Sequence, residues 1–127
     1  MHLVTFDIDG TLTLTNEASD QSFLDALAEV AGIHQVDTNW ESYSNVTDQG
    51  CLEEIFIAAL GRLPTNSETD AVRHCFAQLL RQRAALDPQL IRGVDGAAEA
   101  FAALQQRGDV VMAIATGTWL ECAEIKL

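Results

Sequence analysis

Positive charge is the scarcest property of this 127-residue chain. Seven lysines and arginines stand against nineteen aspartates and glutamates, so the formal net charge is −12, and Lys126 is the single lysine. A strongly acidic surface repels phosphate-rich polymers and anionic lipid surfaces. We therefore expect no nucleic-acid partner and no membrane partner.

Cysteines and long apolar runs are also few. The three cysteines, Cys51, Cys75 and Cys122, form no Cys-x-x-Cys pair, and their odd number disfavours a disulfide framework. No apolar stretch is long enough to span a membrane, and no basic-then-apolar signal peptide is present. These features predict a soluble, cytoplasmic protein.

Two apolar stretches that end in polar residues carry most of the information. The first, at residues 3–8, runs through Asp7 and Asp9 into Gly10 and Thr11. Its apolar pattern predicts a buried strand, and Gly10 predicts a turn. Ligands of open α/β sheets bind at the carboxyl ends of the strands, where these two carboxylates would lie. The alternative is a plain acidic turn, because Asp and Gly are common turn residues.

The second stretch, at residues 110–115, predicts another buried strand and ends in Thr116, Gly117 and Thr118. A hydroxyl and main-chain amides at a strand-to-helix junction suit an anion. By itself this pattern also fits a common turn. Its position downstream of Asp7 and Asp9 favours the anion-binding interpretation.

Helical patterns fill most of the remaining chain. The predicted helices run from Ser19 to a stop at Gly32, from Thr47 or Asp48 to Gly61, from Ser67 to Pro88, and over residues 93–108. Residues 32–46 and 62–66 read as loops. We expect the loop aromatics Trp40 and Tyr43 to pack between helices rather than bind a ligand.

The run D-x-D-G-T-L-T, the helical middle and the later strand ending in Thr-Gly-Thr together resemble the haloacid dehalogenase-like (HAD) hydrolases. The likeness is to members with a helical cap, of the phosphoglycolate phosphatase-like and β-phosphoglucomutase-like type. It implies an α/β fold with a partial Rossmann-like core, of which only the first strands are present, at residues 1–16 and 90–127. An α-helical cap at residues 17–89 would be inserted between them.

The resemblance also implies a chemistry. Asp7 would be the nucleophile that forms an aspartyl-phosphate, and a ligand of Mg²⁺ as the cofactor. Asp9 would be the general acid and base, with its main-chain carbonyl as a second metal ligand. Thr116 and Gly117 would hold the phosphate of a small phosphorylated metabolite. An acid at position 9 favours phosphoryl transfer over dehalogenation, because a departing halide needs no proton.

Thr47 and Asp48 resemble a Thr-Asp pair at the start of a cap helix in the same group of enzymes. The resemblance implies that they contribute to substrate specificity. The alternative is that either residue simply caps the helix, because Thr and Asp are both good N-cap residues. One residue can do both, so the two interpretations stay open.

The chain departs from the family pattern after Thr116. The family places a Lys or Arg and further acids on later elements, whereas Lys126 follows Thr116 too closely to match. We expect Lys126 to be a solvated helix residue, and we place Glu121 and Glu124 outside the metal site. The later motifs are thus absent, which predicts the N-terminal part of a phosphatase that is inactive by itself.

Other interpretations remain. A sugar phosphomutase would differ only in the group that accepts the phosphoryl, and a truncated, non-catalytic HAD-like binding module would keep Asp7 and Asp9 without turnover. A plain α/β domain with no site is the third. Because two strands with unpaired edges are marginal by themselves, we expect a homodimer through the core edge, an exposed apolar patch, or low thermal stability.

Overall fold

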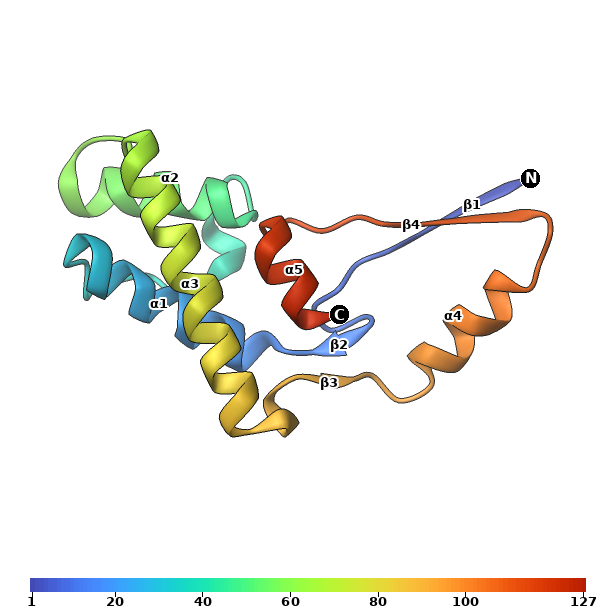
Figure 1. Cartoon of the computed structure of the whole chain (residues 1–127). Helices are drawn as coiled ribbons and strands as arrows, with labels where there is room; N and C mark the ends of the chain where they lie inside the picture. The colour runs from blue at the N-terminus through green and yellow to red at the C-terminus, as the bar shows by residue number, and fades with distance from the viewer.

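The computed structural model describes residues 1–127 and has a helical block beside a thin layer of strands (Figure 1). The helical block contains α1 (Asn16–Ala31), α2 (Asp48–Leu60) and α3 (Asn66–Leu86), with short 3-10 turns at Trp40–Ser42 and Pro88–Leu90. The remaining elements are β1 (His2–Phe6), β2 (Thr13–Leu14), β3 (Arg92–Gly93), α4 (Ala97–Gln105), β4 (Val110–Ile114) and α5 (Leu120–Lys126). The predicted α/β class, with few strands and a helical insert, is confirmed.

Strands β1 and β4 pair in parallel, with His2 opposite Val110 and Phe6 opposite Ile114. The Ala115 N–H extends the ladder by donating to the Phe6 carbonyl at 2.8 Å. This register places the carboxyl ends of the two strands side by side. The two polar segments that the sequence singled out therefore leave the sheet at the same edge.

Strands β2 and β3 form a second, antiparallel pair, in which Thr13 lies opposite Gly93 and Leu14 opposite Arg92. The Val94 N–H also donates to the Leu12 carbonyl at 3.0 Å. This ladder joins the segment after the first motif to the segment that leaves α3. The two crossings between the strand layer and the helical block therefore run next to each other.

Two helices begin earlier than predicted, and the last predicted helix is shorter. Helix α4 covers Ala97–Gln105 rather than residues 93–108, because Gly93 belongs to β3 and Gly96 adopts a left-handed conformation before the helix. Gly32 and Gly61 adopt left-handed backbone conformations and terminate α1 and α2, as expected. Helix α1 begins at Asn16 rather than Ser19. Helix α3 begins at Asn66 rather than Ser67, because Thr65 and Glu68 form a reciprocal capping box.

The hydrophobic core lies in the helical block. It contains fourteen buried residues, drawn mostly from α1, α2 and α3, and α5 adds Cys122. The strand layer is different. The predicted strands form, but the prediction that they are buried is wrong: no residue of β1 or β4 is buried, and Leu3, Val111 and Ile114 are exposed. The two strands pair only with each other, and α4, which follows them in the layer, buries none of its own residues. Apolar side chains are thus exposed on both faces of this layer. No helix combines the length and apolarity that a bilayer crossing requires.

Candidate active site

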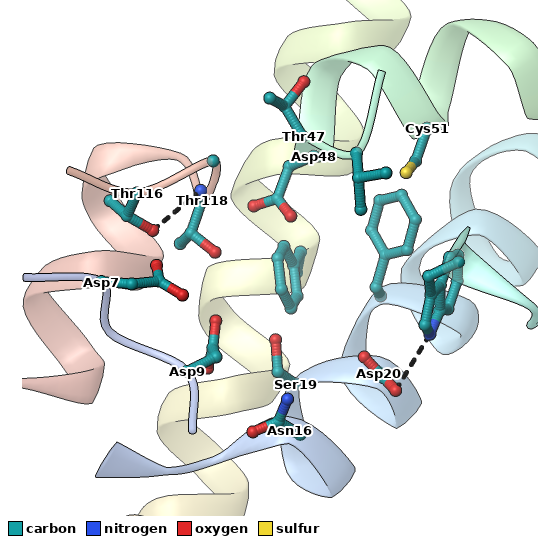
Figure 2. Close-up of a pocket in the computed structure, with 15 residues that line it drawn as sticks. Asp7, Asp9, Asn16, Ser19, Asp20, Thr47, Asp48, Cys51, Thr116 and Thr118 are labelled. Carbon is teal, nitrogen blue, oxygen red and sulfur yellow. Dashed lines mark hydrogen bonds between the residues drawn. The ribbon is translucent and has the colours of Figure 1, made fainter. Parts of the chain in front are cut away.

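Asp7 and Thr116 lie at the adjacent ends of β1 and β4 and line one cavity of about 260 Å³ (Figure 2). Asp7 is the first residue after β1, and Thr116 is the second residue after β4. Thr116 Oγ1 accepts a hydrogen bond from the Thr118 N–H at 3.1 Å, which shapes the loop after β4. The parallel register thus brings a carboxylate and a hydroxyl-bearing loop to the same space.

Asp9 is positioned by a tight turn around the buried residue Ile8. The Leu12 and Thr13 N–H groups donate to the Ile8 carbonyl at 2.9 and 3.0 Å. Gly10 has a φ of 79°, a left-handed conformation that side-chain-bearing residues rarely adopt. The Asp-x-Asp-Gly spacing therefore produces a fixed turn that directs Asp9 towards the cavity.

Both carboxylate oxygens of Asp9 already have partners within the chain. The Thr15 hydroxyl donates to Oδ1, and Lys126 Nζ lies 2.9 Å from Oδ2. Lys126 Nζ also lies 3.3 Å from Thr118 Oγ1. These contacts occupy both carboxylate oxygens and tie the turn after β1 to the C-terminal turn of α5.

The expectation that Lys126 is solvated is wrong: its side chain is fully buried. The cause is the packing of α5. Cys122 and Ala123 are the buried residues of this short helix, and Lys126 follows Cys122 by one helical turn on the same face. The face that anchors α5 therefore also carries its lysine towards Asp9.

Thr47 and Asp48 connect the first turn of α2 to the loop after β4, and both line the cavity. Thr47 is the N-cap, since its hydroxyl accepts a hydrogen bond from the Gly50 N–H at 2.9 Å. The Asp48 N–H donates to the Gly117 carbonyl at 2.9 Å, and the Asp48 carboxylate accepts from the Trp119 N–H at 3.0 Å. The capping interpretation thus applies to Thr47, and Asp48 joins the helical block to the loop.

Gly117 allows this close approach. A Cβ atom at position 117 would lie 3.0 Å from the Val46 carbonyl oxygen and 3.1 Å from Thr47 Cα. Both neighbours are main-chain atoms, which cannot rotate away. A side chain here would therefore push the start of α2 away from the loop.

The cavity is acidic. Its charged lining residues are all aspartates, namely Asp7, Asp9, Asp20 and Asp48. Burial raises the pKa of Asp48 to about 6, against the lowering effect of the Trp119 N–H. Burial also raises the pKa of Asp20, which the indole hydrogen bond of Trp40 opposes. Neither Asp20 nor Asp48 forms a salt bridge, whereas Asp9 is paired with Lys126.

The residues of α1 that line the cavity were not predicted from the sequence. Asn16, Ser19, Asp20 and Phe23 line it from α1, and Trp40 Nε1 donates to Asp20 Oδ2 at 3.0 Å (Figure 2). A signal existed, because positions 16, 19, 20 and 23 form one face of a helix. The polar residues of this face are also what a solvated first turn of a helix would contain. The predicted helix began at Ser19, so it did not include Asn16.

The oxygen donors at the strand ends suit a hard cation, although they form an incomplete shell. Mg²⁺ commonly takes one or two protein carboxylates and completes its octahedron with water and phosphate oxygens. Asp7 provides an accessible carboxylate of this kind. No group of three or more His, Cys, Asp or Glu side chains is placed to enclose a metal ion. The residues present fit a metal that shares its shell with ligand and solvent.

The chain has an α/β fold in which a helical block is inserted between the strand that carries the acids and the strand that precedes the hydroxyl loop. The sequence profile of the haloacid dehalogenase-like hydrolases matches residues 1–127. The chain belongs to this family. A search of curated protein sequences found no match.

Solved structures share this fold. CbbY from Rhodobacter sphaeroides, in complex with phosphate, superposes with a TM-score of 0.69 at 22% identity, over 98% of this chain and 54% of that one. A predicted phosphoglycolate phosphatase from Haemophilus somnus gives a TM-score of 0.57 at 20% identity, over 94% and 52%. The chain thus spans about half the length of these proteins.

Proposed function

We propose that this chain carries the nucleophile and phosphate loop of a Mg²⁺-dependent phosphatase that acts on small phosphomonoesters. One observation carries the proposal: Asp7 and Thr116 face one cavity from the adjacent ends of two parallel strands. The phosphate bound to CbbY adds support, because that protein shares the fold over nearly the whole chain. We further propose that residues 17–89 act as the cap and residues 1–16 and 90–127 as the core.

In the proposed reaction an Asp7 carboxylate oxygen attacks phosphorus, and the bond from phosphorus to the leaving oxygen breaks. This forms an aspartyl-phosphate, which water then hydrolyses. Thr116 and the main chain at Gly117 hold the phosphate oxygens. Asp7 and the main-chain carbonyl of Asp9 would hold Mg²⁺, which reduces the repulsion between the carboxylate and the phosphate.

The proton for the leaving oxygen comes from Asp9 in this scheme, so Asp9 must first bind one. Its Oδ1 is engaged by Thr15 and its Oδ2 by Lys126. For Asp9 to reach the leaving oxygen, at least one of its two contacts must be exchanged for that oxygen. The acid role thus requires a rearrangement at Thr15 or at Lys126.

The same contacts favour a second candidate, a non-catalytic phosphate-binding module. If Thr15 and Lys126 keep their contacts with Asp9, neither carboxylate oxygen is free to reach a leaving group. Asp7, Thr116 and the loop can still bind a metal and phosphate. The two candidates differ only in turnover.

The decisive experiment measures p-nitrophenyl phosphate hydrolysis with Mg²⁺ by this chain and by a form extended through any coding sequence that follows. Asp7→Asn and EDTA serve as controls. We expect turnover by the extended form that either control abolishes, and negligible turnover by the 127 residues. An inert extended form that still binds Mg²⁺ and phosphate would replace the phosphatase with the binding module.

A further inference from the structure

The cavity has an uneven charge pattern along its length. Asp7 and Thr116 lie at one end, and Asp20 lies across the cavity beside Trp40 (Figure 2). No arginine, lysine or histidine lines any part of it. Lys126 is nearby, but its buried ammonium is bound to Asp9 and Thr118. The end that would receive the leaving alcohol therefore has no cation to bind a second acidic group of a substrate.

That same end combines a carboxylate with aromatic rings. Asp20 Oδ2 accepts the Trp40 indole N–H at 3.0 Å, so the indole fixes the carboxylate, and the rest of its acceptor capacity stays available. The Phe23 ring centroid lies 6.1 Å from that of Trp40 and 5.5 Å from that of Phe76, and all three rings line the cavity. Aromatic faces and a carboxylate both attract an ammonium group.

We propose that the substrate is a phosphomonoester of a small amino alcohol. Its ammonium group contacts Asp20 and the rings of Trp40 and Phe23, while its phosphate occupies the end marked by Asp7 and Thr116. This inference rests on the proposed function and names its substrate class. The cavity of about 260 Å³ limits the alcohol to a few heavy atoms.

Charge excludes the main competitors. A carboxylate or a second phosphate on the leaving group would lie beside Asp20 and Asp48 with no cation to compensate it. The like charge of these carboxylates repels such a group, and no cationic side chain lines the cavity to offset the repulsion. A neutral polyol can use the oxygen acceptors but gains nothing from the rings. The expected order of affinity is therefore cationic, then neutral, then anionic leaving groups.

Calorimetric titration of the 127-residue chain with Mg²⁺ tests this order. O-phosphoethanolamine, glycerol 2-phosphate and phosphoglycolate are the ligands, because they are of similar size and differ in the charge of the alcohol. Inorganic phosphate reports on the phosphate end alone. We expect O-phosphoethanolamine to bind about tenfold more tightly than phosphoglycolate, the ratio that one charge-assisted contact supplies.

Asp20→Asn is the diagnostic variant, because an amide oxygen can still accept the Trp40 N–H while the charge is lost. We expect it to abolish the preference for O-phosphoethanolamine and to leave inorganic phosphate binding unchanged. Glu17→Gln is the matched control: it removes the same charge from an exposed position in the first turn of α1, outside the cavity lining.

The outcomes separate the two proposals. If inorganic phosphate binds but phosphoglycolate equals O-phosphoethanolamine, or if Asp20→Asn leaves their ratio unchanged, the amino-alcohol assignment is overturned and the phosphatase proposal survives. If no phosphate compound binds with Mg²⁺, both proposals fail. A Glu17→Gln effect as large as that of Asp20→Asn would reduce the preference to a general charge effect and overturn the contact at Asp20.

Discussion

Lys126 Nζ lies 2.9 Å from Asp9 Oδ2, across a sequence separation of 117 residues. The lysine side chain is fully buried, whereas that of Asp9 keeps a quarter of its surface exposed (25%). The pair joins the last turn of α5 to the turn after β1. The single lysine of the chain therefore serves as the internal counter-charge of the acid that the proposed reaction needs.

The unequal burial of this pair predicts unequal effects of removing either partner. Asp9→Asn leaves a buried ammonium without a counter-charge, which costs about 3 kcal/mol of unfolding free energy. Lys126→Met costs less, because water can reach the carboxylate that remains. The double variant should recover most of the loss, as a buried pair replaced by uncharged groups is often neutral. Urea unfolding of the four proteins gives the coupling energy.

Additive losses in that cycle would mean that the two side chains do not interact in solution.

Thr15→Val tests the other Asp9 contact, since it removes the hydroxyl that donates to Oδ1. Its loss should be smaller than that of Asp9→Asn, because no charge is stranded.

The local features of this fold could be predicted from the sequence because they depend on neighbouring residues. The apolar runs before Asp7 and Thr116 form strands, and Gly32 and Gly61 end their helices. The parallel pairing of β1 and β4 is the usual arrangement for two strands joined through helices. The position of the two site ends at one sheet edge was therefore accessible without a structure.

The burial of Lys126 and the role of Asp20 could not be predicted in the same way. Both depend on long-range packing: α5 turns its lysine towards a residue near the other end of the chain, and Trp40 reaches back to α1. A lone Lys or Asp on a helix usually faces water, so local pattern favoured the wrong environment for Lys126. Contacts between distant elements bury Lys126, whereas Asp20 stays exposed and is distinguished by its hydrogen bond to Trp40.

Asp48 predicts a distinct pH dependence of stability. Its pKa is about 6 in the folded chain and near its ordinary 3.8 when unfolded, mainly because of burial. The folded state then binds more protons between these values, so unfolding free energy falls as pH rises from 4 to 6. Asp48→Asn keeps an acceptor for the Trp119 N–H and should raise unfolding free energy at pH 7 by about 2 kcal/mol.

Chemical unfolding at pH 4 and pH 7 checks this, with Asp95→Asn as a control at an exposed position. The stabilisation by Asp48→Asn should disappear at pH 4, where the native carboxyl is already protonated. An equal gain at both pH values, or a loss at pH 7, would contradict the assignment of burial as the cause.

Gly117→Ala tests whether the approach of α2 to the loop after β4 is as close in solution as in the structure. The added methyl would lie 3.0 Å from the Val46 carbonyl oxygen, so we expect a loss of about 1 kcal/mol from overpacking. Gly108→Ala is the matched control, since a Cβ there has no neighbour within 4 Å and its backbone φ is not positive. Thermal unfolding of both variants should show a loss for position 117 alone.

The exposed strand layer predicts self-association. Leu3 (68% exposed) and Val111 (50%) are register partners on one face of the β1–β4 pair. Ile114 (41%) is on the other face, where it lines an apolar cavity of about 610 Å³ with residues of α4 and α5. Unpaired strand edges next to apolar surface favour pairing with another chain.

We expect sedimentation velocity to show concentration-dependent association. Val111→Lys should weaken this association, because a charge on this surface resists burial. Ile57→Lys, at an equally exposed apolar position on α2, is the control and should leave association unchanged. A strictly monomeric chain at high concentration would contradict this prediction.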